Sequence, residues 1–452
     1  MRLLVLATTT GYQTRAFGAA AERLGIDLVF ATDRCHLIDD PWQDGAIAIR
    51  FFDEDASVAA ILSAAADRPI DGLIVVGDRP TVIAARAAEA LGLPWHPPAA
   101  AAIARHKQRT RECLRDGGLP APWFVTTSLS SGDRQAIRGL SARSPIPNPE
   151  SPFPCVVKPV ALSGSRGVMR ADDPRQLAAA LERLRALMRS PEVRAERNDA
   201  HDIALVEEFI PGREYAVEAL MHHGEMLVLA LFDKPDPLDG PFFEETMYVT
   251  PSRVGAGEQR AIVDAIARAA AAIGLRHGPI HAECRVEPDG VVYVLEIAAR
   301  PIGGLCAGVL RFAPRAGAGI RDAGGGMRVS LEELLLRHAL GEDPAGWERE
   351  ADASGVMMIP IPRRGIFRGV DGIDEAREVA GVEDVRITAK PDQLLVPLPE
   401  GASYLGFIFA RAGRADAVDR ALREAHRRLS FAIDPEFPLL TSAQINYNRT
   451  HG

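Results

Sequence analysis

Apolar and polar residues alternate along the N-terminal part of the chain in a way that predicts strands and helices in turn. Short apolar runs predict buried strands, and alanine-rich amphipathic stretches predict helices. The strands are expected at residues 3–7, 27–31 and 72–76, and the helices at residues 14–24 and 80–91. This alternation is typical of a parallel sheet covered by helices. We therefore predict an N-terminal α/β domain over residues 1–98.

The remainder of the chain mixes helices with strands and predicts two further domains, which agrees with the length of 452 residues. Helices are expected at residues 99–116, 174–188, 258–273, 330–340 and 415–429. Strands are expected at residues 154–159, 227–232, 356–360, 383–389, 393–397 and 404–410. We expect a central domain over residues 99–310 and a C-terminal α+β domain over residues 311–452.

A predicted hairpin over residues 281–304 carries the first candidate chemistry. Its two strands flank Asp289-Gly290, a dipeptide that favours a two-residue turn. Counting outward from that turn places Glu283 opposite Glu296, and opposed residues project from the same face with their Cβ atoms about 5 Å apart. Carboxylates this close repel one another unless a cation lies between them. Because Mg²⁺ prefers oxygen ligands and completes its shell with phosphates, the hairpin predicts a metal–phosphate site.

The alternative is a solvent-facing hairpin whose charges only increase solubility. Residues 291–297 are too apolar for an exposed edge, so Glu296 is expected to be the single charge within a buried strand. A register shift of one residue would separate the two carboxylates and remove the site. Arg300 follows on the same face as Glu296, and Gly303-Gly304 leave bare backbone N–H groups beside it.

Composition and charge exclude several classes of function. The net charge of −9 gives no reason to expect nucleic acid or an anionic membrane as partner. No apolar run is long enough to cross a bilayer, and the N-terminus predicts a strand rather than a signal peptide. The five cysteines are scattered and form no CxxC pair, which favours reduced thiols in a cytoplasmic protein.

Lysine is rare in this chain, with only Lys107, Lys158, Lys234 and Lys390 among 52 basic residues. A chain that uses arginine nearly everywhere is expected to keep lysine where a compact ammonium is required. Lys158 ends a predicted strand and is followed at once by a Gly/Ser loop, residues 163–168, whose backbone N–H groups can approach phosphate oxygens. An ordinary hairpin turn explains this loop about as well.

Residues 204–218 resemble the adenine-binding hinge of ATP-grasp enzymes; their sequence is Ala-Leu-Val-Glu-Glu-Phe-Ile-Pro-Gly-Arg-Glu-Tyr-Ala-Val-Glu. The resemblance implies that Glu207 binds the adenine amino group, that Ile210 offers its backbone and that Glu214 binds the ribose. It also implies cofactor-binding positions at Glu208 and Leu295.

The same resemblance accounts for the earlier motifs. Lys107 and Lys158 fall where ATP-grasp enzymes place phosphate-binding lysines, and Glu283 and Glu296 fall on the two magnesium carboxylates. The mobile phosphate loop corresponds to Ser163, Gly164, Ser165 and Gly167. The implied architecture is an ATP-grasp fold with a Rossmann-like N-terminal domain, in which residues from about 120 to 200 form a mobile lid. ATP and Mg²⁺ are the implied cofactors, with Mn²⁺ as an alternative.

One departure concerns the second metal carboxylate. Many ATP-grasp enzymes place Asn two residues after it, where this chain has Ala298. The form Glu-Ile-Ala-Ala-Arg is similar to the L-amino-acid ligase branch, which lacks that Asn. Lys234 is then a third candidate for the γ-phosphate, Glu245 is expected to bind or deprotonate an incoming amine, and Arg300 to stabilise an oxyanion.

The resemblance implies an ADP-forming carboxylate–amine ligase that works through an acyl phosphate, with amino acids as candidate substrates. Its partners are then a small carboxylate and a small amine, and a homodimer remains open. Two alternatives stay open as well: a biotin-carboxylase-like carboxylation of a small molecule, and an ATP-binding module without turnover. Loss of turnover on replacing Glu296 by glutamine separates an enzyme from the binding module.

Overall fold

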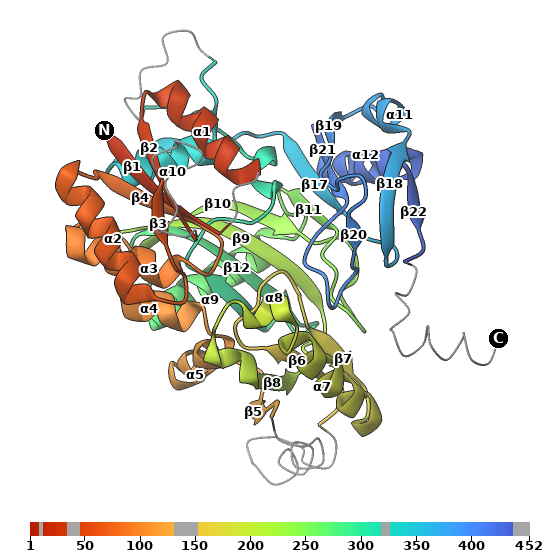
Figure 1. Cartoon of the computed structure of the whole chain (residues 1–452). Coiled ribbons are helices and arrows are strands. Elements are labelled where there is room, and N and C mark those ends of the chain that lie inside the picture. The colour runs from red at the N-terminus through yellow and green to blue at the C-terminus, as the bar shows by residue number, and fades with distance from the viewer. Residues whose placement is uncertain (9–11, 34–45, 131–151, 318–325, 437–452) are drawn as a thin grey trace, which may run out of the picture.

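The computed structural model describes residues 1–8, 12–33, 46–130, 152–317 and 326–436. Figure 1 shows a long central sheet with the N-terminal part on one side, the C-terminal part on the other, and a smaller helix-covered sheet below. Part of the predicted lid falls outside the described ranges. Within those ranges, none of the helices combines the length and the apolar character that a membrane crossing requires.

The N-terminal part is the predicted parallel sheet, with strand order β3-β2-β1-β4. The side chains of β1 are buried, and Leu3, Leu4 and Leu6 have no exposed surface. The strands are β1 (Arg2–Ala7), β2 (Asp27–Asp33), β3 (Ile47–Ile49) and β4 (Gly72–Val76), and the helices are α1 (Tyr12–Leu24), α2 (Glu54–Asp67) and α3 (Thr81–Leu91). The sequence did not predict β3 and α2.

The helix expected over residues 99–116 is two helices, α4 (Pro98–Ala104) and α5 (Lys107–Asp116). The single-helix prediction was wrong because His106 has an extended backbone and caps α5, its ring accepting from the Arg109 N–H at 3.4 Å. This break places Lys107 at the first position of α5, with its backbone N–H donating to Val160 O.

The central sheet has eight strands in the order β13-β12-β9-β10-β11-β17-β21-β19. Its strands are β9 (Arg213–His222), β10 (Glu225–Asp233), β11 (Met247–Thr250), β12 (Gly278–Val286), β13 (Val292–Ala298), β17 (Ala353–Ile359), β19 (Val382–Ile387) and β21 (Gly406–Ala412). The pairing of β11 with β17 joins strands from both sides of residue 310 into one sheet. The three domain boundaries given above stay predictions.

The two faces of β9 and β12 differ in chemistry because successive side chains alternate. Tyr215, Val217 and Ala219 pack, with residues of β12, into an apolar cluster beneath α9 (Ala256–Ile273). The opposite face of β9 carries Glu214 and Glu218. Because β9 is buried on both faces, its acidic face contacts another part of the protein.

Two smaller units flank this sheet. The lid sheet has the order β5-β8-β6-β7, and a separate apolar cluster joins it to α7. Its elements are β5 (Phe124–Ser128), β6 (Cys155–Pro159), β7 (Met169–Ala171), α7 (Pro174–Met188), α8 (Pro191–Arg194) and β8 (Ile203–Glu208). The C-terminal part adds β14 (Arg311–Pro314), β15 (Val329–Ser330), α10 (Leu331–Ala339), β16 (Trp347–Arg349), β18 (Gly365–Asp371), α11 (Ile373–Arg377), β20 (Leu394–Leu395), α12 (Ala415–Arg428) and β22 (Ser430–Asp434). Ser330 and Glu333 form a capping box at the start of α10.

The hairpin of β12 and β13 has the predicted pairing of Glu283 with Glu296, although the turn differs from the prediction. The Glu287 N–H donates to Val291 O, so the loop has three residues rather than two. A bulge then leaves Leu295 unpaired, which restores the register. The two deviations cancel, and the prediction for the carboxylate pair is confirmed.

We expect Gly212→Ala to lower the free energy of unfolding more than Gly224→Ala. Both glycines have φ of +99°, which costs an alanine about 1–2 kcal/mol. At Gly212 a Cβ would also lie 2.0 Å from the backbone oxygen of Val286, whereas at Gly224 it meets nothing within 4 Å. The collision should add about 1–3 kcal/mol, measured by urea denaturation. Equal losses in the two variants would contradict the packing of residue 212 against β12.

Candidate functional site

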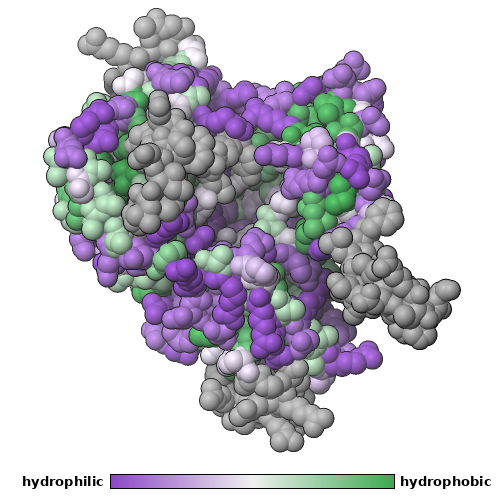
Figure 2. Space-filling model, viewed as in Figure 1, coloured by the Kyte–Doolittle hydropathy of each residue, from purple (hydrophilic) through white to green (hydrophobic). Residues whose placement is uncertain are grey.

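A cavity of about 540 Å³ lies where the central sheet meets the N-terminal part, the lid and the C-terminal part. In Figure 2 the surface is hollowed between the N-terminal and C-terminal parts, with hydrophilic side chains around the opening. The predicted site residues that line the cavity are Lys107, Lys158, Ser163, Gly164, Ser165, Glu207, Glu208, Ile210, Glu214, Glu245, Glu283, Leu295, Glu296 and Arg300. The sheet register and the loop positions therefore bring nearly the whole predicted set together.

Two predicted residues do not line the cavity. The backbone N–H of Gly167 donates to Pro399 O at 2.8 Å, so it is already engaged by the protein, and its predicted contact with phosphate stays a prediction. A Cβ at this position would lie 2.9 Å from Leu184, which gives the glycine a packing role. The other residue, Lys234, lies beneath the cavity floor among carboxylates.

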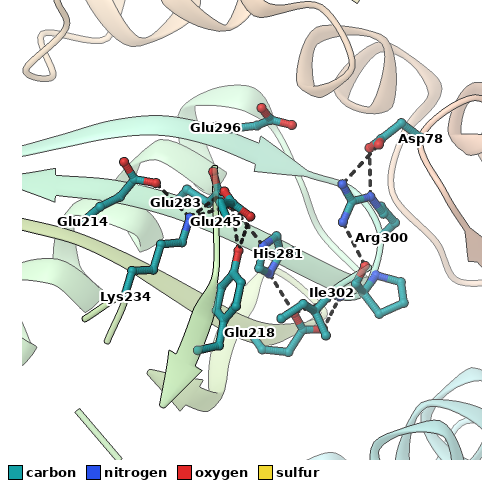
Figure 3. A network of polar contacts seen from close by, with 12 residues as sticks. Asp78, Glu214, Glu218, Lys234, Glu245, His281, Glu283, Glu296, Arg300 and Ile302 are labelled. Carbon is teal, nitrogen blue, oxygen red and sulfur yellow. Dashed lines mark hydrogen bonds and ion pairs between the residues drawn. The ribbon is translucent and has the colours of Figure 1, made fainter. Parts of the chain in front are cut away.

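The floor of the cavity is an acidic cluster around Lys234 (Figure 3). The Nζ of Lys234 lies 2.8 Å from Glu214, 2.8 Å from Glu245 and 3.0 Å from Glu283. Carboxylate oxygens of the three glutamates all lie within 4.8 Å of one another. Burial opposes the charge of the ammonium, but the surrounding carboxylates raise the pKa of Lys234 well above its usual value. This cation offsets the repulsion among the three carboxylates of the floor.

Tyr248 connects two members of this cluster, since its hydroxyl lies 2.7 Å from Glu245 and 3.3 Å from Glu283. Burial and the neighbouring Glu283 raise the pKa of Glu245 to about 7. The pKa of Glu283 is lowered well below its usual value; burial opposes this shift, and Lys234 and His281 produce it.

Glu296 stands apart from this cluster on β13, where its carboxylate lies 3.0 Å from the Nζ of Lys107. Lys107 also donates to Leu162 O at 2.8 Å, so it links the phosphate-loop segment to the hairpin. The donor set of Glu283 and Glu296 consists of oxygens on a rigid scaffold, which fits a divalent cation such as Mg²⁺. Their direct role as ligands stays a prediction.

Glu207 is held by two cations in the wall below the lid. Arg111 donates to both of its oxygens at 2.9 and 3.1 Å, and Lys158 forms a short ion pair with it. Burial opposes the charge, but Arg111 and Lys158 hold the pKa of Glu207 at about 2. The sequence analysis missed Arg111. Its side chain has no exposed surface and lies with Thr110 and Leu114 on the buried face of α5.

The other hinge residues are also engaged by protein groups. Arg285 donates to Glu214 at 2.9 Å and to the carbonyl of Ile210 at 2.8 Å. The backbone N–H of Trp123 donates to Glu208 at 3.4 Å. The predicted contacts with adenine and ribose stay predictions. Arg285 fixes the loop between β8 and β9 from below.

The predicted phosphate loop has a left-handed backbone at Gly164 and Ser165, with φ of +66° and +53°. A non-glycine residue in this region is uncommon and is often found at functional sites. Arg166 donates to Glu400 O at 2.8 Å, so the loop lies against the C-terminal part. Successive N–H groups in such turns form concavities that bind anions.

Arg300 forms a bidentate ion pair with Asp78, at 2.9 and 3.1 Å. Asp78 follows β4, at the carboxyl end of the N-terminal sheet, where parallel α/β sheets commonly bind ligands. It was missed by the sequence analysis, although its position after a buried strand was a usable indication. The pair joins the N-terminal part to the segment that follows β13.

His281 links the hairpin to β9. Its Nδ1 lies 3.1 Å from Glu218, which also accepts from the backbone N–H of Ile302 at 3.1 Å. Burial opposes protonation, but hydrogen bonds to Glu218 and Glu283 raise the pKa of His281 to about 9. These contacts hold the ring of His281 in place between Glu218 and Glu283.

The chain matches three domain families. Residues 18–95 match an ATP-grasp N-terminal domain, residues 151–309 an ATP-grasp domain, and residues 357–434 an L-amino acid ligase C-terminal domain 2. The crystal structure of L-amino acid ligase from Bacillus licheniformis superposes with a TM-score of 0.73 at 25% identity, covering 96% of this chain and 98% of that one.

Curated proteins match over shorter stretches. Carnosine synthase 1 of Gallus gallus is 32% identical over 239 residues, which are 52% of this chain and 24% of that protein. D-alanine–D-alanine ligase of Aromatoleum aromaticum is 30% identical over 204 residues, which are 45% of this chain and 58% of that protein. The chain thus spans less than two thirds of the length of each of these relatives.

Proposed function

Since the chain is an ATP-grasp protein that also carries an L-amino acid ligase C-terminal domain, we propose that it is an ATP-dependent carboxylate–amine ligase. The products are ADP, phosphate and a compound with a new C–N bond. The observation that carries this proposal is the pairing of Glu283 with Glu296 in a cavity that Lys107 and Lys158 also line.

The reaction is proposed to run in two steps. A carboxylate oxygen of the acid attacks the γ-phosphorus of ATP, the bond to the β-phosphate oxygen breaks, and ADP leaves. The amine then attacks the acyl carbon, and the phosphate leaves with the electron pair of the broken C–O bond. Phosphoryl transfer asks a protein chiefly for positioning and neutralisation of charge.

Lys107 and Lys158 supply positive charge beside the phosphate loop, and Ser163–Ser165 supply backbone N–H groups. Glu283 and Glu296 would hold Mg²⁺, which when bound would supply positive charge that neutralises the phosphates. Arg300 and the Gly303-Gly304 amides would stabilise the oxyanion of the tetrahedral intermediate, a contact often worth about 3 kcal/mol. Closure of the lid over the cavity would exclude water from the acyl phosphate.

Glu245 is proposed to bind the incoming amine and to accept its proton. The carboxylate lies on the cavity floor within hydrogen-bonding distance of Tyr248 and Lys234, which orient it. A general base must lie within reach of the proton that it takes, and Glu245 faces the same cavity as the carboxylates of the hairpin.

Amino acids are the proposed substrates, because the part matched to the L-amino acid ligase C-terminal domain contributes apolar side chains to the cavity wall. Met358 and Phe407 are buried there, and Tyr404 lies beside Phe407 with ring centroids 6.3 Å apart. Such a wall suits an aliphatic or aromatic side chain. The cytoplasmic location and the homodimer stay predictions.

The first measurement is product formation from ATP, Mg²⁺ and pools of amino acids and other carboxylates. We expect release of ADP and phosphate that requires both an acid and an amine, with omission of the amine as the matched control. Release of AMP would exclude the acyl-phosphate mechanism, and ADP release with bicarbonate alone would favour a carboxylase. ATP binding without ADP release in every pool would favour a binding module.

A further inference from the structure

Three histidines lie close together on the central sheet, outside the cavity described above. His222 ends β9, His277 precedes β12, and His338 lies in α10. His222 lies four residues beyond Glu218 on the same face of β9, which corresponds to about 13 Å along the strand. The cluster is therefore separate from the acidic floor of the cavity.

The ring nitrogens of the three histidines converge on one point. His222 Nδ1 lies 3.2 Å from His338 Nε2, and one nitrogen from each of the three rings lies within 4.8 Å of the other two. The rings of His277 and His338 are stacked at 4.3 Å with an angle of 14°. Nitrogens bound tetrahedrally to one Zn²⁺ lie about 3.3 Å apart, so small ring rotations bring these atoms to ligand geometry.

One of these rings has a buried nitrogen that makes no hydrogen bond. His277 is 5% exposed, and its Nδ1 is buried without a partner. Buried polar atoms in proteins are nearly always satisfied, and an exception calls for an explanation such as an ion.

We propose that His222, His277 and His338 bind one Zn²⁺ ion that fastens α10 to the central sheet. Three imidazoles without a carboxylate suit a borderline transition cation and not Mg²⁺ or Ca²⁺, which prefer oxygens. His223, whose ring centroid lies 4.9 Å from that of His277, is placed to occupy or border the fourth position.

The role of the ion follows from what it connects. α10 contributes Leu331, Leu334 and Leu335 to the same apolar cluster as the N-terminal sheet. A metal held jointly by α10, the end of β9 and the segment before β12 therefore ties the N-terminal part to the central sheet. The site is structural, and it requires neither ATP nor turnover.

The test is equilibrium dialysis of the full-length untagged chain against buffered Zn²⁺, with millimolar Mg²⁺ present to occupy carboxylate sites. Bound zinc is measured by mass spectrometry. We expect one Zn²⁺ per chain in the wild type and in Glu283→Gln, and at least tenfold weaker binding in His222→Gln and His338→Gln. His426→Gln in α12, far from the cluster in sequence, is the matched control and should bind normally.

Circular dichroism shows whether the variants fold. His222→Gln is expected to disturb folding less than His338→Gln, because His222 is only half-buried and its replacement leaves a smaller cavity. Zinc should also raise the melting temperature of the wild type by a few degrees and leave that of folded His222→Gln unchanged. Less than one zinc per chain, or zinc binding that is lost in Glu283→Gln but kept in His222→Gln, would overturn the proposal.

Discussion

Replacing Glu296 with glutamine is expected to lower the rate of ADP formation by about 10²–10³-fold while the protein stays folded. The side chain is 27% exposed, and its ion pair is with Lys107, so a neutral residue of the same shape leaves the packing intact. What the variant loses is the charge of one of the two opposed carboxylates that we propose as metal ligands. Steady-state assays over a range of Mg²⁺ concentrations measure the effect, and circular dichroism verifies the fold.

Glu287→Gln serves as the matched control, because Glu287 lies at the turn of the same hairpin and outside the cavity. It should retain nearly all activity. If Glu296→Gln turned over at the wild-type rate, the assignment of the hairpin as the phosphate-facing metal site would be wrong.

Replacing Lys234 with methionine is expected to lower the free energy of unfolding by about 3–5 kcal/mol. The ammonium is 3% exposed and compensates three carboxylates, which would be left buried and close together. The midpoint of urea denaturation measures the loss. Millimolar Ca²⁺ or Mg²⁺ should recover part of it, because the unpaired carboxylates would then attract a divalent cation.

Lys390→Met provides the comparison, since Lys390 is exposed and outside the cavity. This substitution should change the midpoint little. If Lys234→Met lowered the free energy of unfolding no more than Lys390→Met does, the floor carboxylates would not need the ammonium to stay buried.

The sequence predicted the parts of the site that depend on local pattern. The period of two in the hairpin placed Glu283 opposite Glu296, and the scarcity of lysine directed attention to Lys107 and Lys158. The turn and the bulge were not foreseen, because a dipeptide indicates a turn but says little about the loop length around it. Lys390 shows the limit of the lysine argument, since it is a surface residue.

Contacts between distant segments were not predictable in this way. Arg111 meets Glu207 across 96 positions, and Arg300 meets Asp78 across 222. The sequence contains many arginines, and nothing local distinguishes these two. Only the packing of α5 and β4 against the central sheet determines that they form these ion pairs. The same holds for Lys234, whose partners come from three separate strands and loops.

The walls of the cavity are backed by different apolar clusters, which has an evolutionary consequence. Behind Lys158 lies the lid cluster with Val157, behind Glu283 the cluster with Cys284, and beside Phe407 a third with Ile408. A substitution in one wall therefore need not be accommodated by the others. Proteins that descend from one ancestral gene can therefore come to use different substrates through substitutions at positions such as Phe407. The residues that face ATP can stay unchanged meanwhile.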